Sequence, residues 1–436
     1  MRTRLFLLFV FFVVLNTKAQ TLFDTTGQSA KLQWFAQAKL GIFIHYGIYA
    51  VNGIDESWAF YNLKISWEDY MKQLDGFTAS AYQPDRWAEL FDEAGAKYAI
   101  LTTKHHDGVA LWPTAAHTYN TLENTPAKRD LVEPFCQSIR AKGIKVGLYF
   151  SLIDWSHNDY PAWTKTKNRY NVSEDTARWL RFQSYCQAQI NEISQRYNPD
   201  IFWFDGDWEH TAAEWQAPNI RRNILTTNPK AIINSRLQGY GDYATPEQFL
   251  PITRPENTPW ELCLTTNDQW GYQPRDTNYK TPNQVIRIFA DCIGNGGNLL
   301  LDVGPKPDGT IPTEQANILK GLGRWTHKHA EAIYNTQAGL PLGYFYGPST
   351  LSDDRKTLYL YMTERPNGPI QVKGLVSKVN KIRVVGTNQT LTSRIMMKLS
   401  WSTTPGILYI NVPVTVLDPD LTVIALELDS PCQVHK

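Results

Sequence analysis

The stretch "IFWFDGDW", residues 201–208, indicates what kind of fold this chain adopts. Four large apolar side chains lead directly into Asp205, Gly206 and Asp207. An unbroken apolar run of this length is typical of a strand buried on both faces, as in a parallel sheet covered by helices. The two carboxylates stand where such a strand ends, so they mark a candidate reactive site.

Comparable strands recur along the chain and alternate with amphipathic helices such as residues 84–97, 130–143 and 174–197. This alternation predicts a parallel sheet with helices packed outside it. The series favours a (β/α)8 barrel of the TIM type, or one that lacks a regular strand, over an open sheet, because the chain has neither a Gly-rich dinucleotide fingerprint nor a P-loop. The predicted strands lie at 41–47, at 98–108 together with its exit loop, and at 145–151, 200–206, 231–236, 260–265 and 298–304.

Beyond about residue 340 the pattern of the sequence changes. Short runs there alternate apolar and polar residues and are broken by Asn-Gly, Pro and Ser. This pattern is typical of antiparallel strands in a β-sandwich. We therefore expect a catalytic barrel over residues 20–340 and a β-sandwich over residues 341–436.

The first nineteen residues have the features of a secretory signal peptide. Arg2 and Arg4 precede an apolar run from Leu5 to Leu15, and Ala19 supplies a small residue for cleavage. That run is too short for a transmembrane helix, and no other stretch is long enough. We expect an exported protein, periplasmic or extracellular, without membrane insertion.

Composition excludes several classes of partner and site. Hydrophobic residues make up 42% of the 436 residues and the formal net charge is +1, so a large core forms and nothing suggests nucleic acid as a partner. The five cysteines are too widely spread for a disulfide framework or a zinc motif, although one pair could form a bridge in an oxidising compartment. They are Cys136, Cys186, Cys263, Cys292 and Cys432.

Polar residues collect where the predicted strands end, which in a barrel of this type is the face that carries the reactive groups. Asp205 alone could be a helix N-cap. The pair His105–His106 could hold a metal, but adjacent strand residues point to opposite faces and no further ligand lies at suitable spacing, so we expect no metal and no cofactor. The strand-end groups include His45, Lys104, His105, His106, Asp107, Tyr149, Ser151, Trp203, Asp205, Asp207, Arg236 and, in the following loop, Glu247.

Paired carboxylates surrounded by histidines, tryptophans and an arginine indicate glycoside hydrolysis. One carboxylate acts at the anomeric carbon, and a second, protonated carboxyl serves the leaving oxygen. The other side chains bond sugar hydroxyls or cover the apolar face of the ring. Two alternatives remain open at this point: a lectin-like module that binds its sugar without cleaving it, and a barrel glycosidase acting on a sugar such as galactose.

These residues lie in stretches that resemble the family 29 glycoside hydrolases, the retaining α-L-fucosidases, in their secreted bacterial form. The resemblance implies a catalytic barrel followed by a β-sandwich, and release of terminal α-L-fucose from glycans or oligosaccharides through a covalent fucosyl-enzyme. It implies either a general α-L-fucosidase or an α-1,3/4-specific relative. The matching stretches include "KLGIFIHYGIYAV" (39–51), "YAILTTKHHDGVALW" (98–112), "IFWFDGDW" (201–208), "GDYATPEQ" (241–248) and "NGGNLLLDVGPKPDGTIP" (295–312).

The resemblance also implies roles for individual residues. Asp205 matches the nucleophile, and Trp270 stands where the family has an aromatic residue against the fucose methyl. Glu56 and Trp58 resemble a Glu–Trp pair of the family, here separated by Ser57. The positions that match sugar contacts are His45, His105, His106, Tyr149, Trp203 and Arg236.

The general acid is not fixed by the resemblance, because the family does not keep it at one sequence position. Glu247 follows the nucleophile by one strand and is the favoured candidate. Glu256 and Glu261 are its rivals, and Glu261 lies early in a predicted strand, which favours a structural role.

Overall fold

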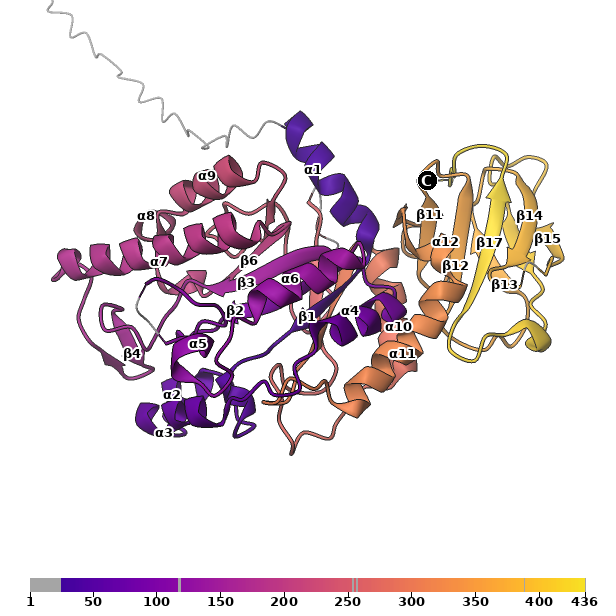
Figure 1. Ribbon diagram of the computed structural model, residues 1–436. Coiled ribbons are helices and arrows are strands. Elements are labelled where there is room, and N and C mark those ends of the chain that lie inside the picture. The colour runs from indigo at the N-terminus through magenta and orange to yellow at the C-terminus, as the bar shows by residue number, and fades with distance from the viewer. Residues whose placement is uncertain (1–24, 117–118, 253–254, 256–257, 388, 436) are drawn as a thin grey trace, which may run out of the picture.

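The computed structural model describes residues 25–116, 119–252, 255, 258–387 and 389–435. The predicted signal peptide and Glu256 lie outside these residues. Figure 1 shows a larger part in which helices surround a sheet, and beside it a smaller part made of antiparallel strands. No helix within the described residues is long and apolar enough to cross a membrane.

The larger part is built on seven parallel strands, in the order β7-β6-β3-β2-β1-β9-β8. Residues 242–248 connect the two edge strands: Tyr243 bridges to Asn234 beyond β7, and Glu247 bridges to Cys263 in β8. An irregular segment therefore takes the eighth place, which confirms a TIM-like barrel without one regular strand. The strands are β1 (Leu40–Ile44), β2 (Tyr98–Lys104), β3 (Lys145–Ser151), β6 (Ile201–Asp205), β7 (Ile232–Ile233), β8 (Glu261–Thr265) and β9 (Asn298–Val303).

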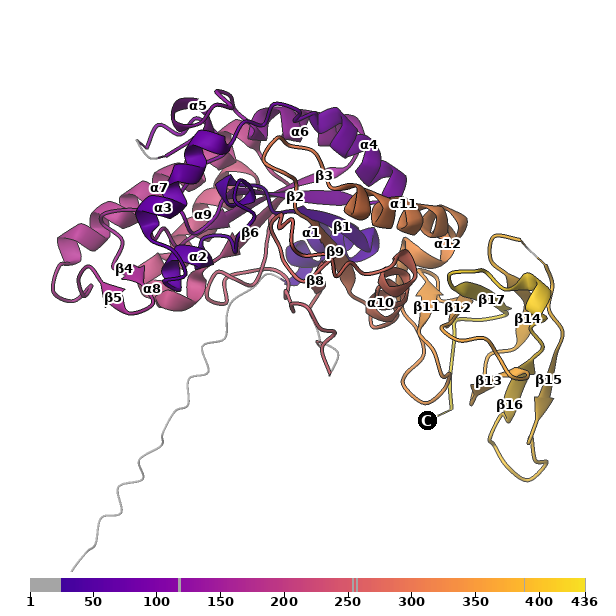
Figure 2. The ribbon, with the colours of Figure 1, turned by 90° about the horizontal axis from the view of Figure 1, so that it is seen from below.

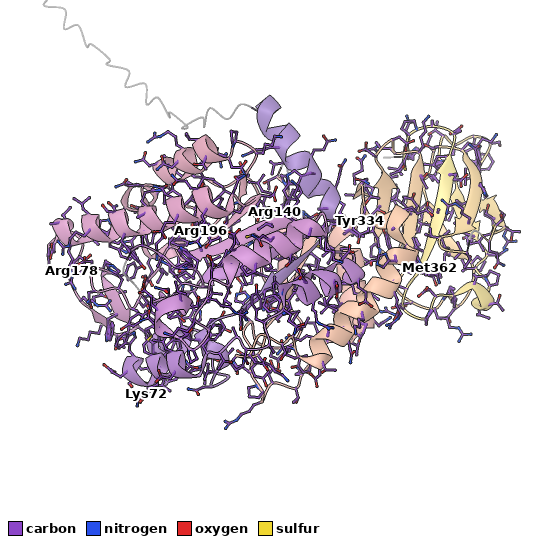
Figure 3. All side chains as sticks on the ribbon, viewed as in Figure 1. Lys72, Arg140, Arg178, Arg196, Tyr334 and Met362 are labelled. Carbon is purple, nitrogen blue, oxygen red and sulfur yellow. The ribbon has the colours of Figure 1, made fainter. Side chains whose placement is uncertain are left out.

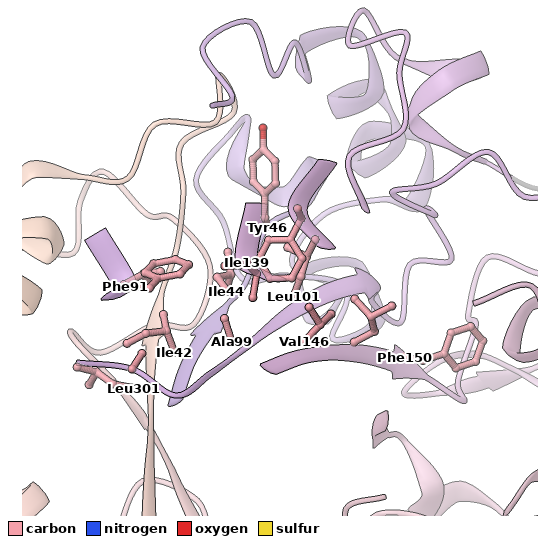
Figure 4. Packing of buried hydrophobic residues seen from close by; sticks show 14 of the residues in the cluster. Ile42, Ile44, Tyr46, Phe91, Ala99, Leu101, Ile139, Val146, Phe150 and Leu301 are labelled. Carbon is pink, nitrogen blue, oxygen red and sulfur yellow. The ribbon is translucent and has the colours of Figure 1, made fainter. Parts of the chain in front are cut away.

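Alternate residues of each strand face the barrel interior and the surrounding helices. In β6, Phe202 and Phe204 belong to the apolar layer beneath the helices, whereas Trp203 belongs to the inner cluster. Figure 4 shows this outer layer, with the β-strand residue Ile42 near Phe91. The helices around the sheet are α4 (Pro84–Ala94), α6 (Val132–Ala141), α7 (Thr176–Tyr197), α9 (Ala217–Thr227), α10 (Pro282–Gly294) and α11 (Thr313–Lys328).

An additional helix, α1 (Thr25–Ala38), packs against the barrel interior at the end where the strands begin. Its Phe35 ring lies 4.4 Å from that of Tyr243, and the Phe35 carbonyl accepts a hydrogen bond from the side chain of Asn298 (2.7 Å). Helix α1 thus closes this end of the barrel, and the opposite end carries the polar groups of the candidate site. The short elements on the polar side are α2 (Trp58–Tyr61), α3 (Trp67–Met71), α5 (Thr121–Asn124), α8 (Ala212–Trp215) and the hairpin of β4 (Ala162–Thr164) and β5 (Lys167–Asn168).

The smaller part has two antiparallel sheets around a core of its own, in the orders β10-β11-β12-β17-β14 and β13-β16-β15. The first sheet begins at Thr336, slightly before the boundary that the sequence suggested. Figure 2 shows α10 next to β11, and Figure 3 places Tyr334 at the junction of the two parts. All five cysteines are buried and free. The elements are α12 (Ala330–Ile333), β10 (Thr336–Ala338), β11 (Ser349–Ser352), β12 (Thr357–Met362), β13 (Ile370–Lys373), β14 (Val379–Val384), β15 (Ser393–Met396), β16 (Ile407–Ile410) and β17 (Thr422–Leu428).

Candidate active site

Asp205, the last residue of β6, lies at the centre of the polar groups. Its Oδ2 accepts a hydrogen bond from the Tyr149 hydroxyl (2.9 Å), and its Oδ1 accepts one from the Arg236 guanidinium (2.8 Å). Nε2 of His106 lies 3.6 Å from Oδ2. Both carboxylate oxygens are thus fixed by donors from β3 and from the loop after β7, which holds the group in one orientation.

Arg236 joins this carboxylate to a second one. Its other terminal nitrogen donates to Glu247 Oε2 (2.7 Å), and its guanidinium lies over the Trp203 ring at 4.6 Å. A planar guanidinium has donors on neighbouring nitrogens, so it positions two carboxylates side by side. The Asp205 side chain is 11% exposed and that of Glu247 is 41% exposed, which places Glu247 on the solvent side.

His106 presents a hydrogen-bond acceptor to the site. Its Nδ1 lies 2.6 Å from the Ser151 hydroxyl, which itself donates to the Ile153 carbonyl. The hydroxyl has a single hydrogen, so Nδ1 must carry the proton of the His106 ring. Burial lowers the pKa of His106 to about 3, so the ring is neutral and Nε2 keeps a free lone pair.

His105 lies beside it, with ring centroids 4.3 Å apart. Its Nδ1 contacts the Ser57 hydroxyl at 2.6 Å, and its ring stacks on Tyr149. Our expectation that the two histidines point to opposite faces is wrong, because β2 ends at Lys104 and strand alternation does not continue beyond it. The described residues contain no group of three or more His, Cys, Asp or Glu side chains suited to a metal ion.

His45 has a partner that the sequence analysis missed. Its Nδ1 lies 2.7 Å from Oδ1 of the fully buried Asp302, in β9. Burial alone would lower the pKa of His45, but the charge and hydrogen bond of Asp302 outweigh it and the pKa is raised. Burial raises the pKa of Asp302 to about 6. The signal was present in the sequence, since Asp302 stands near the end of a buried apolar strand just as Asp205 does.

The Glu56–Trp58 segment closes one side of the site. The buried Glu56 accepts a hydrogen bond from the Gly271 amide (2.6 Å), which anchors the segment carrying Trp270. The Trp270 ring lies 5.0 Å from that of His45, and the Trp58 ring lies 5.5 Å from that of His106. Ser57, which lies between Glu56 and Trp58, is the residue that holds His105.

Glu261 and Asp207 support the site from outside it. Glu261 is fully buried and accepts hydrogen bonds from Trp203 Nε1 (2.7 Å) and the Tyr98 hydroxyl (2.8 Å). Burial raises the pKa of Glu261 to about 7. Asp207 accepts a hydrogen bond from the Gln238 amide (2.7 Å), which fixes the loop that carries Arg236. Of the two carboxylates at and just after the end of β6, therefore, Asp205 is the one that bonds to Tyr149 and Arg236.

The chain as a whole is similar to known proteins. The family model for alpha-L-fucosidase matches residues 13–331. The chain belongs to the α-L-fucosidase family. Members of this family are glycoside hydrolases, and the expected enzyme class and fold are confirmed.

Three relatives show how far the similarity to α-L-fucosidases extends. The structure of isoenzyme 1 from Paenibacillus thiaminolyticus superimposes with a TM-score of 0.84 at 33% identity, covering 93% of this chain and 100% of that one. A Bacteroides thetaiotaomicron fucosidase structure gives 0.81 at 26% identity, covering 92% of this chain and 96% of that one. The tissue enzyme of Rattus norvegicus is 31% identical over 336 residues, covering 69% of each chain.

Proposed function

We propose that this protein is a retaining exo-α-L-fucosidase that removes terminal fucose from fucosylated glycans through a covalent fucosyl-enzyme. The observation that carries the proposal is the single guanidinium, that of Arg236, which contacts both Asp205 and Glu247. A retaining mechanism needs two carboxyl groups close to one glycosidic bond. The Bacteroides thetaiotaomicron structure is described as a trapped covalent intermediate formed with 2-fluoro-fucosyl fluoride, in a glutamate-to-glutamine variant.

Asp205 is the nucleophile in this proposal. A carboxylate oxygen attacks the anomeric carbon while the bond to the leaving oxygen breaks, and Glu247 gives that oxygen a proton. Glu247 then takes a proton from water, which attacks the anomeric carbon and releases Asp205. The greater exposure of Glu247 suits this role, because the leaving group departs and the water arrives from the solvent side.

Glu247 cannot donate a proton while it is paired as a carboxylate with Arg236. We infer that the sugar takes over this contact when it binds, so that Glu247 becomes free to carry a proton and Arg236 keeps its bond to Asp205. The guanidinium then faces the sugar with donors only, whereas His106 offers an acceptor. Such a fixed pattern of donors and acceptors discriminates between sugars more strongly than apolar contact does.

The cellular place of the reaction belongs to the same proposal. The charged, apolar and small-residue pattern of residues 1–19 supports export before the enzyme meets its glycan. We propose that it acts in the periplasm or outside the cell.

The stereochemistry of the products tests the mechanism. With an aryl α-L-fucoside, proton NMR should detect α-fucose before β-fucose, and β-fucose first would contradict retention. Asp205→Ala should be inactive and, with added azide, should form β-fucosyl azide, because azide then attacks in place of the missing nucleophile. Glu247→Ala should instead form α-fucosyl azide from the covalent intermediate.

The same assay decides between the candidate acids. Glu261→Ala should give no azide product, because the residue is buried beneath Trp203. If Glu261→Ala yields the α-azide instead of Glu247→Ala, Glu261 is the acid. If neither variant does, Glu256 becomes the candidate.

A further inference from the structure

A hollow of about 490 Å³ lies in the C-terminal part, apart from all the residues of the active site. Its walls are the segment 343–346, the loop 364–369 between β12 and β13, and the first residues of β13. The volume is within the range of sites that hold small ligands. The mechanism proposed for the barrel does not involve this hollow.

Hydrogen bonds hold part of the walls of the hollow in place. The Tyr344 hydroxyl donates to the His435 carbonyl (2.7 Å), and the Tyr344 carbonyl accepts from the Lys373 amide (2.9 Å). At the start of the loop, the Arg287 guanidinium of α10 donates to the Thr363 carbonyl. The wall that carries Tyr344 and the start of the loop are thus held before any ligand arrives.

An aromatic pair forms one wall of the hollow. The rings of Phe345 and Tyr346 lie 4.5 Å apart, and Tyr346 is 53% exposed although it is a large aromatic residue. Both residues also line a second hollow, of about 320 Å³, against α10. Tyr346 therefore stands between two cavities and can contact a ligand in either of them.

The polar side chains around this pair are free to bind a ligand. The side chains of Glu364, Arg365 and Gln371 have no hydrogen-bond or ion-pair partner within the described residues. They offer an acceptor, a forked donor and an amide with both functions. Charges of both signs beside an aromatic face suit an uncharged molecule with many hydroxyls, such as a sugar. They suit a phosphate or a polyanion less well, because one of the charges would repel it.

We propose that this hollow is a second, non-catalytic carbohydrate-binding site, which holds an uncharged sugar unit of the glycan being processed. That the ligand is part of the fucosylated substrate rests on the proposed function, whereas the inference that a sugar binds in this hollow does not. Tyr346 covers the apolar face of the sugar ring, and Arg365 with Gln371 bonds its hydroxyls. Binding there keeps the enzyme on a large glycan between successive cleavages.

Kinetics on a large and a small substrate test this site. Tyr346→Ala and Arg365→Ala should each raise KM for release of fucose from a fucosylated mucin about fivefold, the loss expected for one aromatic or charge-assisted contact. Both should leave kcat on mucin and all kinetics on an aryl fucoside unchanged. Trp401→Ala is the matched control, because Trp401 is an 82% exposed aromatic residue of the same part and lies outside both hollows.

Each outcome bears on the site. If the two variants match Trp401→Ala on mucin, or if they weaken aryl fucoside hydrolysis as much as mucin hydrolysis, the proposed site is wrong. If the parent protein hydrolyses no fucoside at all, the proposed function fails instead. Retention of the parent and of Tyr346→Ala on a column of immobilised mucin then still tests the site, and equal retention would overturn it.

Discussion

Replacing Asp302 by asparagine tests how far sugar recognition depends on the charge of His45. The 2.7 Å contact between His45 Nδ1 and Asp302 Oδ1 directs the Nδ1 hydrogen toward Asp302, which leaves Nε2 for the proposed contact with the sugar. Nε2 therefore carries a hydrogen only when the ring is doubly protonated. The raised pKa of His45 keeps this donor present at higher pH than an ordinary histidine would.

The size of the effect follows from the hydrogen bond that is lost. Asparagine keeps the shape and the acceptor of Asp302 but removes its charge, so burial again dominates and the pKa of His45 falls. A hydrogen bond to a charged group contributes about 1.5–3 kcal/mol and a neutral one about 0.5–1.5 kcal/mol. The difference of roughly 1–1.5 kcal/mol predicts that kcat/KM for an aryl fucoside falls about five- to tenfold at neutral pH.

The pH dependence gives the sharper measurement. In Asp302→Asn the basic limb of the kcat/KM profile should move to lower pH, because the donor at Nε2 is lost as the pH rises through the lowered pKa of His45. Asp107→Asn is a matched control: Asp107 is equally buried, burial raises the pKa of Asp107 to about 6, and its bond is to the Tyr70 hydroxyl. An unchanged basic limb in Asp302→Asn, or the same shift in Asp107→Asn, would refute the reasoning.

Three further predictions concern substitutions at four other positions. His106→Ala should lower kcat/KM for an aryl fucoside at least about tenfold, and Trp270→Ala should lower it by less. The reason is that a sugar hydroxyl left unpaired costs about 1–3 kcal/mol, whereas a lost methyl contact costs only about 0.8 kcal/mol. The reverse order in steady-state kinetics would show that the methyl contact dominates. The pKa of Glu261 is raised, so the stability that Glu261 contributes is present below about pH 4.5 and is lost as the pH rises through about 7. In Glu261→Gln the free energy of unfolding in urea should therefore vary less with pH over this range, by up to about 3 kcal/mol. If the pH dependence is the same as in the parent, another group causes it. Gly206→Ala should destabilise the fold by at least about 1–2 kcal/mol, because the residue has a φ of +80° and the new Cβ would lie 2.7 Å from Ile153; a melting temperature equal to that of the parent would contradict this.

The strands and the central carboxylate could be read from local patterns in the sequence. Each apolar run that is buried on both faces identifies a strand without reference to its neighbours. The polar residues after such runs must then meet at one end of the barrel, because parallel strands all end on the same side. This logic reaches Asp205, Tyr149 and Arg236, which the structure brings into direct contact.

Other features depend on contacts between residues far apart in the chain, and only the tertiary structure decides them. Residues 242–248 take the eighth place of the barrel, although their sequence has no strand pattern. They bridge to residues at both edges of the sheet because the fold brings those two edges close to them. The orientation of His45 depends on Asp302, and that of His105 depends on Ser57. The sequence determines which side chains reach the active face, but packing across the barrel determines which of them bond to one another, and hence which nitrogen or oxygen each presents to the sugar.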